Sequence, residues 1–282
     1  VYGDHISEYH PVINEPGVYL KSCVTVDSPN YLILYLDLSQ AHSGTFDITF
    51  VNGEKKFVYA YELKERKEST DDIQGYDSSD VLYLIMPDRF ANGDQSNDQI
   101  SMSTEYVMDR SKPGARHGGD LKGIEDHLDY FVDLGVTAIW LNPVLENDGK
   151  GGSYHGYFST DMFHVDRRLG SNEDYLRLIN KAHQKGLRVV MDMIFNHIGA
   201  NHPWVLDVPS KDWFNVSPSK RGNHAKAIFY DNYASTYDSE VMKYAGFGID
   251  LNQANPHVGK YLIQNSIWWI EYARIDAIRQ DT

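Results

Sequence analysis

Four short apolar runs, separated by segments with helical spacing, dominate the chain after residue 80 and constrain its fold more than any other feature. The runs are VLYLIMP (81–87), TAIWLNP (137–143), LRVVMDMIF (187–195) and RIDAIRQD (274–281). Between them, residues 123–135, 171–186 and 257–273 repeat apolar positions with the period of a helix, and Ser171 is a suitable N-cap. Continuous apolar runs are typical of strands buried on both faces, and the strand–helix alternation predicts an α/β fold with a parallel sheet.

The first 68 residues have a different texture and predict a small β-sandwich. They contain the runs VYLKSCVTV, YLILYLDLS, GTFDITFVN and KKFVYAYEL, with turn signals between them. Asn52-Gly53 is a typical hairpin turn. The polar KERKESTDD stretch that follows is typical of a linker. We therefore expect two domains, 1–68 and 69–282, the second interrupted after its third strand by a loop-rich insertion at 197–256.

Charged side chains gather where the predicted strands end. Arg279 and Asp281 are two residues apart, so both point the same way from a strand. A carboxylate fixed beside a cation stays ionised and is able to act as a nucleophile, although a structural ion pair is the alternative. Asp192 stands near the end of the third strand, where one carboxylate would pair with Arg279. Because βα-barrels hold their chemistry at the carboxyl ends of the strands, an active site is expected there.

Imidazole and aromatic side chains near the same ends are suited to holding a sugar ring. His197 follows the third strand and either bonds substrate hydroxyls or is a satisfied loop histidine. Tyr154, His155 and Tyr157 are grouped with glycines after the second strand. The alternative for these three is an aromatic-rich loop that packs on the barrel.

A loop rich in oxygen donors follows the first strand and is a candidate calcium site. The side-chain donors are Asn92, Asp94, Asn97, Asp98 and, further along, Asp120. Calcium takes six to eight hard oxygen ligands, so this density suits it. An EF-hand match that begins at Asp94 fails, because Gln99 stands where that motif needs glycine. The alternative is a solvated turn, since Asn-Gly-Asp forms turns by itself.

The charge and the cysteine count exclude some classes of partner and leave others open. The formal charge is 26 − 40 = −14, which is expected to repel nucleic acid and anionic membranes. Cys23 is the single cysteine, so the redox compartment stays open, and no apolar run approaches a membrane helix in length. Val1 is not a natural start, so we expect that an N-terminal segment has been removed.

Taken together and in order, these motifs resemble the α-amylase superfamily of glycoside hydrolases, in its neopullulanase and cyclomaltodextrinase branch. DMIFNH resembles the first signature region, IDAIRQD the second, and PDRFANGD with GGDLKGI the start of the barrel and the calcium loop. The resemblance implies an accessory, carbohydrate-binding-like β-sandwich followed by the first half, about four βα units, of a TIM (β/α)8 barrel. It implies that Asp281 is the nucleophile, that Arg279 fixes it, that Asp192 pairs with Arg279, and that His197, Tyr157 and His155 contact the sugar. It also implies a calcium ion held by Asn92, Asp94, Asn97, Asp98, the Gly118 carbonyl and Asp120.

The resemblance further implies a retaining hydrolase of starch, pullulan or cyclodextrin, with α-1,4- and α-1,6-glucan oligosaccharides as partners. The family takes its general acid, a Glu, from strand five, whereas this chain stops at strand four, so we expect a fragment without glycosidase activity. Transglycosylation and non-catalytic glucan binding are the alternatives. Homodimerisation through the N-terminal domain stays open, and the resemblance implies a periplasmic or secreted bacterial protein, with a cytoplasmic location as the alternative.

Overall fold

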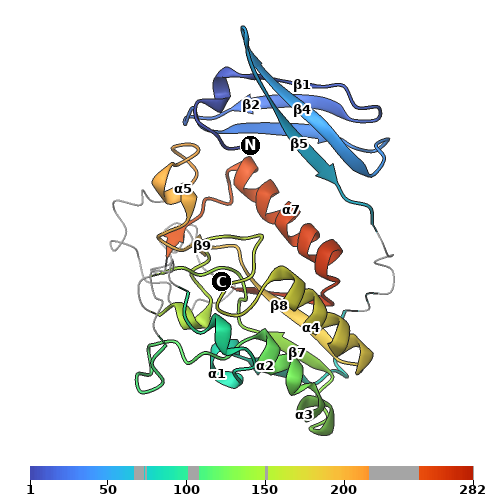
Figure 1. Ribbon diagram of the computed structural model, residues 1–282, viewed down its shortest axis with the longest axis vertical. Coiled ribbons are helices and arrows are strands. Elements are labelled where there is room, and N and C mark those ends of the chain that lie inside the picture. The colour runs from blue at the N-terminus through green and yellow to red at the C-terminus, as the bar shows by residue number, and fades with distance from the viewer. Residues whose placement is uncertain (67–72, 74, 101–107, 150–151, 216–247, 282) are drawn as a thin grey trace, which may run out of the picture. The chain divides into compact units, whose positions relative to one another are not determined.

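A computed structural model describes residues 1–66, 73, 75–100, 108–149, 152–215 and 248–281 (Figure 1). The chain divides into two compact units. One consists of Val1–Ser69 with Leu206–Trp213, and the other of Thr70–Val205 with Phe214–Thr282. Among the described residues, no helix is both long enough and apolar enough to cross a membrane.

The first unit contains two antiparallel sheets. One has the order β1-β4-β5 and the other pairs β2 with β3. The elements are the 3₁₀ helix η1 (Ile6–Glu8), β1 (His10–Ile13), β2 (Tyr19–Thr25), β3 (Leu32–Asp37), β4 (Gly44–Asn52) and β5 (Lys55–Leu63). The four predicted strands are confirmed, and the short β1 was not predicted. The hairpin turn is also confirmed, because β4 and β5 pair up to Asn52 and Lys55 while Gly53 takes a φ of 58° at the tip.

Alternate residues of β4 supply much of the core of this unit. Phe46, Ile48 and Phe50 are buried, whereas Thr45 and Asp47 between them are exposed. They pack with Ile6, Val18 and Leu32 in one apolar cluster. Successive side chains of a strand point to opposite faces, so this alternation places one face of β4 in the core.

A segment that the sequence places inside the insertion belongs structurally to the first unit. The Asp207 carboxylate accepts hydrogen bonds from Ser28 Oγ and from Asn30 Nδ2, both at 2.7 Å. Tyr31 donates its hydroxyl to the Asp207 carbonyl at 2.9 Å. Residues 206–213 are therefore fastened to the β2–β3 turn by side chains more than 170 positions away in the chain, a contact that local sequence patterns do not reveal.

The second unit is built on a four-stranded parallel sheet of order β11-β8-β7-β6, so neighbouring strands follow chain order. The strands are β6 (Leu82–Ile85), β7 (Ala138–Leu141), β8 (Arg188–Ile194) and β11 (Ala277–Asp281). The longer helices are α4 (Asn172–Gln184) and α7 (Pro256–Ala273), and α4 contacts both β8 and α7. The predicted parallel sheet is confirmed over these four strands.

The predicted capping of α4 is confirmed. Ser171 Oγ accepts from the Asp174 N–H at 3.1 Å, and the Asp174 carboxylate accepts from the Ser171 N–H at 2.9 Å. This reciprocal capping box satisfies two of the backbone donors that a helix leaves unpaired at its start. Gly186 follows the helix with a φ of 75°, in the conformation that glycine adopts at helix ends.

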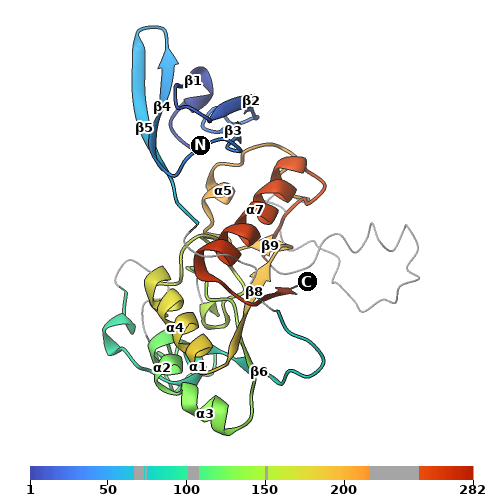
Figure 2. The ribbon, with the colours of Figure 1, turned by 90° about the vertical axis from the view of Figure 1, so that its right-hand side faces the viewer.

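The single helix predicted over 123–135 is wrong, because two short helices occupy this stretch. They are α2 (Leu121–Asp126) and α3 (Leu128–Asp133), and α2 lies beside α4 in both views (Figures 1 and 2). His127 between them has φ −115° and ψ 20°. Its ring Nδ1 lies 2.7 Å from the Gly123 carbonyl, while its N–H bonds Ile124. In a continuous α-helix the His127 N–H would bond the Gly123 carbonyl. The His127 ring occupies that carbonyl instead, and the helix breaks there.

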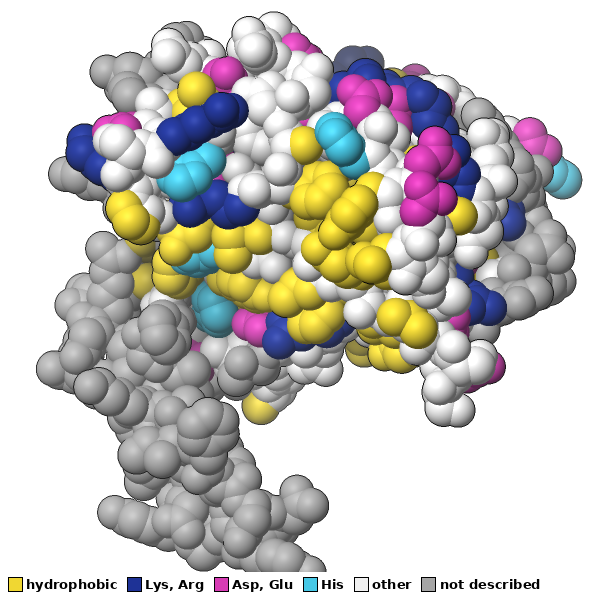
Figure 3. Space-filling model, turned by 90° about the horizontal axis from the view of Figure 1, so that it is seen from below, with side chains coloured by type: hydrophobic (Ala, Val, Ile, Leu, Met, Phe, Trp, Pro, Cys, Tyr) yellow, Lys and Arg dark blue, Asp and Glu magenta, His cyan; other side chains and the backbone are white. Residues whose placement is uncertain are grey.

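The prediction that the first parallel strand is buried on both faces is also wrong. Leu82 and Leu84 are 39% and 51% exposed, whereas Ile85 is buried. Leu82 and Leu84 alternate with Tyr83 and Ile85, so they point to one face of β6, and the described residues leave that face open. Tyr130 on α3 and Leu134, directly after this helix, are exposed as well, and hydrophobic side chains gather on the face seen in Figure 3.

Short elements carry the loops between the strands and the helices. They are α1 (Pro87–Phe90), η2 (Gln95–Asn97), η3 (Ser153–His155), β9 (His197–Ile198), α5 (Pro203–Leu206) and β10 (Ile249–Asp250). The strand β9 pairs with β10. Residues 216–247 of the predicted insertion lie outside the described residues.

Candidate functional site

Two carboxylates and one guanidinium meet near the carboxyl ends of β8 and β11. The parallel register sets Arg279 of β11 beside Asp192 of β8. Arg279 Nη1 donates to both Asp192 oxygens, at 3.1 and 3.2 Å, and to Asp281 Oδ1 at 2.5 Å. A single cationic group therefore bridges the two acidic side chains, as the spacing of the motifs predicts.

The buried carboxylate of Asp192 also accepts two neutral donors. Trp140 Nε1 on β7 and the Tyr157 hydroxyl both lie 3.0 Å from Asp192 Oδ2. Burial raises the pKa of Asp192, and the Trp140 hydrogen bond and the Arg279 charge act in the opposite direction. Burial and the nearby Asp192 charge raise the pKa of Tyr157, so its hydroxyl stays protonated and donates.

His197 is buried on the short strand β9 and fixes the loop that carries Tyr157. Its Nε2 lies 2.9 Å from the Tyr157 carbonyl, which accepts, so Nε2 carries the proton. Burial lowers the pKa of His197, which favours the neutral ring. Gly248 permits this packing, since a Cβ there would lie 2.6 Å from His197 Cδ2.

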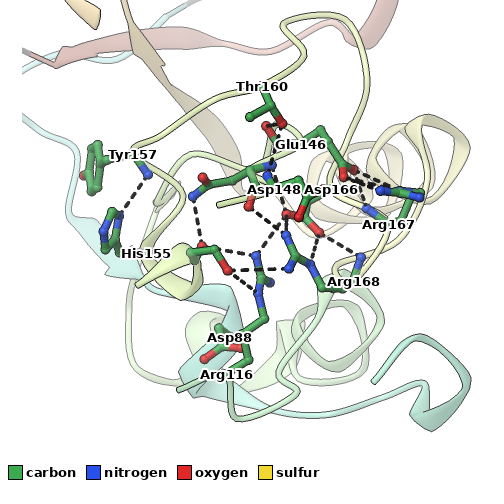
Figure 4. Close-up of polar contacts among 12 residues, drawn as sticks. Asp88, Arg116, Glu146, Asp148, His155, Tyr157, Thr160, Asp166, Arg167 and Arg168 are labelled. Atoms are coloured by element: carbon green, nitrogen blue, oxygen red, sulfur yellow. Dashed lines mark hydrogen bonds and ion pairs between the residues drawn. The ribbon is translucent and has the colours of Figure 1, made fainter. Parts of the chain in front are cut away.

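The loop after β7 aims His155 and Tyr157 through hydrogen bonds of its own. The Tyr157 N–H donates to His155 Nδ1 at 3.0 Å (Figure 4), and Asn142 Nδ2 donates to the His155 carbonyl at 3.2 Å. Gly156 between them has a φ of 85°, and a Cβ there would lie 2.1 Å from the Pro143 carbonyl oxygen. Only glycine fits this close approach.

The structure brings five of the six predicted site residues into one contact network, and His155 joins it through the Tyr157 backbone. Sequence reasoning missed Trp140, whose ring also lies under the Arg279 guanidinium at 5.0 Å. The available signal was its place inside a predicted strand, TAIWLNP (137–143), whose end was expected to carry the site. A carboxylate–guanidinium pair flanked by phenol, indole and imidazole suits a neutral, hydroxyl-rich ligand.

The predicted calcium loop is held together largely by Asp120. Its two carboxylate oxygens accept from the Gly93, Asp94 and Gly123 N–H groups, at 3.0, 2.8 and 2.6 Å, and from Asn97 Nδ2 at 3.3 Å. Asp120 is thereby the N-cap of α2. These four donors occupy the lone pairs of both oxygens.

The amide oxygens of the same loop are the part that fits a cation best. Asn92 Oδ1 and Asn97 Oδ1 are buried and accept no hydrogen bond from the described residues. Asp98 and Gly118 lie next to them, because Asn92 Nδ2 donates to Asp98 Oδ1 at 2.6 Å and a Cβ on Gly118 would lie 2.6 Å from that oxygen. Among the described side chains, no three of the His, Cys, Asp and Glu kinds come close enough to hold a metal. The two acceptors without a partner among the described residues are amide oxygens, a kind of ligand that calcium takes.

Two family models match the chain along most of its length. Residues 84–282 match the α-amylase catalytic domain, and residues 1–67 match the N-terminal domain of cyclomaltodextrinase. The boundary between the two matches falls in the stretch that the sequence predicts to be a linker.

Curated relatives and solved structures agree with these matches. The chain is 36% identical to an intracellular maltogenic amylase of Bacillus subtilis over 72% of its length, and 35% identical to a cyclomaltodextrinase of Geobacillus thermopakistaniensis over 71%. It spans 33% of each of these relatives. An Anoxybacillus α-amylase structure superposes with a TM-score of 0.59 at 40% identity, covering 72% of this chain and 40% of that one. The α-amylase of Geobacillus thermoleovorans complexed with acarbose gives 0.55 at 36% identity, with the same coverage.

Proposed function

This chain belongs to the α-amylase family, and on that premise we propose that the protein hydrolyses α-glucans by a retaining double displacement in which Asp281 is the nucleophile. The observation that carries the proposal is the Arg279 guanidinium, which bridges Asp281 and Asp192 at the carboxyl ends of two parallel strands. An oriented carboxylate at this edge of the sheet is what attack on an anomeric carbon requires.

The proposed reaction has two steps. Asp281 forms a bond to the anomeric carbon while the glycosidic C–O bond breaks, and a carboxylic acid donates a proton to the leaving oxygen. Water then attacks the same carbon, the Asp281 ester is released, and the acid regains a proton. Asp192 already accepts from Arg279, Trp140 and Tyr157, so we assign it to holding Arg279 and not to the acid.

We assign the sugar contacts to Tyr157, His155 and His197. Tyr157 is fixed at both ends, because its phenol hydroxyl donates to Asp192 and its backbone carbonyl accepts from His197. A ring held this way offers its face to a sugar beside Asp281. The likeness to an α-amylase complexed with acarbose supports an α-glucan oligosaccharide as the ligand.

The test uses the complete gene product, its Asp281→Asn variant, and Asp129→Asn as a matched control on an exposed carboxylate of α3. Reducing-end release is measured on soluble starch, pullulan and cyclodextrin, and a fluorinated glycosyl substrate is used to trap the covalent intermediate. We expect activity in the native and control proteins, its loss in D281N, and a trapped sugar on the Asp281 peptide. Trapping of the sugar on another carboxylate would overturn the assignment of Asp281. Transglycosylation products in place of free reducing ends would identify a transglycosylase.

We further propose that the loop around Asn92 and Asn97 holds a calcium ion. Their side-chain oxygens, with Asp98 and the Gly118 carbonyl, would supply the ligands, and the ion would brace the loop that follows α1. Calcium titration of metal-stripped protein by calorimetry, with the melting temperature recorded in parallel, tests this. Asn97→Ala is expected to weaken binding, whereas Asn172→Ala, an amide outside the loop, is not. Equal calcium affinity in all three proteins would refute the site.

A further inference from the structure

A cluster of charged side chains that the sequence analysis did not single out is buried beneath the loop carrying His155 and Tyr157. Arg116, Asp166 and Arg168 are 5%, 1% and 3% exposed. Figure 4 shows the two guanidinium groups converging on Asp166, while Arg167 points away from them toward Glu146. Charged groups are rarely this deeply buried unless they are paired, so the cluster has a definite structural purpose.

The carboxylate of Asp166 binds both cations. Arg116 Nη2 donates to Asp166 Oδ2 at 3.0 Å, and Arg168 donates through Nε to Oδ1 at 2.9 Å and through Nη2 to Oδ2 at 2.8 Å. Burial by itself would raise the pKa of Asp166, but the two guanidinium groups lower it to about 2. Two positive charges and one negative charge are therefore retained inside the protein.

The remaining donors of the cluster converge on the first residue of η3. Ser153 Oγ accepts from Arg116 Nε at 3.0 Å, and the Ser153 carbonyl accepts from Arg116 Nη2 at 3.1 Å and from Asn147 Nδ2 at 2.9 Å. Asn147 is held in turn, because its N–H donates to Asp166 Oδ2 at 3.1 Å and its carbonyl accepts from Arg168 at 2.7 Å. The cluster thus fixes the start of the turn that ends at His155.

The backbone on either side of Arg116 is itself fixed. The His117 N–H donates to both Asp88 oxygens at 3.0 Å, and the Arg116 carbonyl accepts from the Asp109 N–H at 2.9 Å. Asp88 is buried at the start of α1, directly after β6. A set of hydrogen bonds therefore runs from Asp88 in α1 through His117 and Arg116 to Ser153.

Stability alone is a weak reason to keep such a cluster, because apolar residues of similar volume often stabilise an interior as well or better. We propose that Arg116, Asp166 and Arg168 position the sugar-contacting turn, with Arg116 acting through Ser153 on His155 and Tyr157. The inference rests on the proposed function, because that proposal gives His155 and Tyr157 of this turn the role of contacting the substrate. A displacement of about 1 Å at a reacting group can cost about 100-fold in rate, so a rigid support beneath the turn matters for activity.

The test is a double-mutant cycle on the complete gene product. The variants are Arg116→Met, Tyr157→Ala and the double variant, with Arg167→Met as the control, because Arg167 belongs to the same stretch but pairs with Glu146 at the surface. Acarbose affinity is measured by calorimetry, kcat and KM on a maltooligosaccharide, and stability by thermal unfolding. Arg116→Lys keeps one charge beside Asp166 and provides a second variant if R116M does not fold.

If Arg116 acts through Tyr157, R116M weakens acarbose binding about tenfold or more in the native background and by less than about twofold in the Y157A background. R167M leaves the affinity unchanged, and R116K falls between R116M and the native protein. Equal losses in the two backgrounds, or native affinity in R116M, would overturn the inference, as would failure of both Arg116 variants to fold. Absence of acarbose binding by the native protein would instead contradict the proposed function.

Discussion

Replacing Asp120 by alanine is expected to lower the stability of the second unit, and the structure gives the reason. Asp120 is completely buried and joins the loop after α1 to the first turn of α2. Four N–H donors point at its two oxygens. Removing the carboxylate takes away all four acceptor contacts together.

The size of the effect depends on which donors can find water instead. Gly93 and Asp94 are exposed, so water is able to replace the lost partner of their N–H groups. Gly123 and Asn97 are buried, and each unsatisfied buried donor costs about 1–3 kcal/mol. Loss of the cap at Gly123 is one of these two costs, so we expect D120A to lower the free energy of unfolding by about 2–6 kcal/mol.

Urea unfolding followed by circular dichroism measures this difference, once in EDTA and once with calcium. Asp126→Ala is the control, because Asp126 lies at the other end of α2 with an exposed ion pair to Lys122. We expect the D120A loss to be nearly the same in both buffers, since the hydrogen bonds exist without a metal, and the control to change by less than about 0.5 kcal/mol. A loss below 1 kcal/mol in EDTA that becomes large with calcium would refute the reasoning and make Asp120 primarily a metal ligand.

Three further predictions concern other parts of the chain. Phe50→Ala is expected to cost the first unit about 3–5 kcal/mol in urea unfolding, because Phe50 is fully buried, whereas Val58→Ala on the exposed face of β5 costs little. Burial lowers the pKa of His202 to about 4, so protonation favours the unfolded chain. The free energy of unfolding is therefore expected to fall by about 1.4 kcal/mol per pH unit as the pH drops from about 6.5 to 4. His202→Gln should remove this pH dependence, and an unchanged pH dependence in the variant would contradict the assignment. Trp140→Phe should move the acid limb of kcat/KM to higher pH, because the Trp140 hydrogen bond lowers the pKa of Asp192, and an unmoved limb would exclude that role.

Local sequence patterns predicted the elements well where the period was regular. The run GTFDITFVN is the strand β4, and Ser171 is the N-cap of α4, as predicted. The break at His127 was not predictable in the same way, because it comes from a ring nitrogen that takes the Gly123 carbonyl. The exposure of Leu84 depends on what packs against its face of β6, and an apolar run carries no information about that packing.

The candidate site was predictable to the extent that it lies at strand ends. Asp192 and Arg279 belong to short motifs at those ends, and the parallel sheet brings them together. Arg116 and Asp166 are 50 residues apart in otherwise ordinary polar stretches, and nothing local indicates that both are buried. Such a pair becomes visible only when the loops between strands are folded. Sequence reasoning therefore singled out the charged residues at the strand ends and missed the buried cluster beneath the loop after β7.

The chemistry of the site depends finally on the register of a single strand. In β11, Arg279 lies beside Asp192 because Ala277 lies beside Val190, and a slip of one residue would turn the guanidinium to the opposite face. Asp276 fixes that register, since its N–H donates to the Val189 carbonyl at 3.0 Å and its carboxylate accepts from the Val189 N–H at 2.7 Å. The same oxygen lies 2.8 Å from His183 Nε2 on α4. Asp276, directly before β11, therefore determines whether Arg279 meets Asp192 on β8 as well as Asp281 at the end of its own strand.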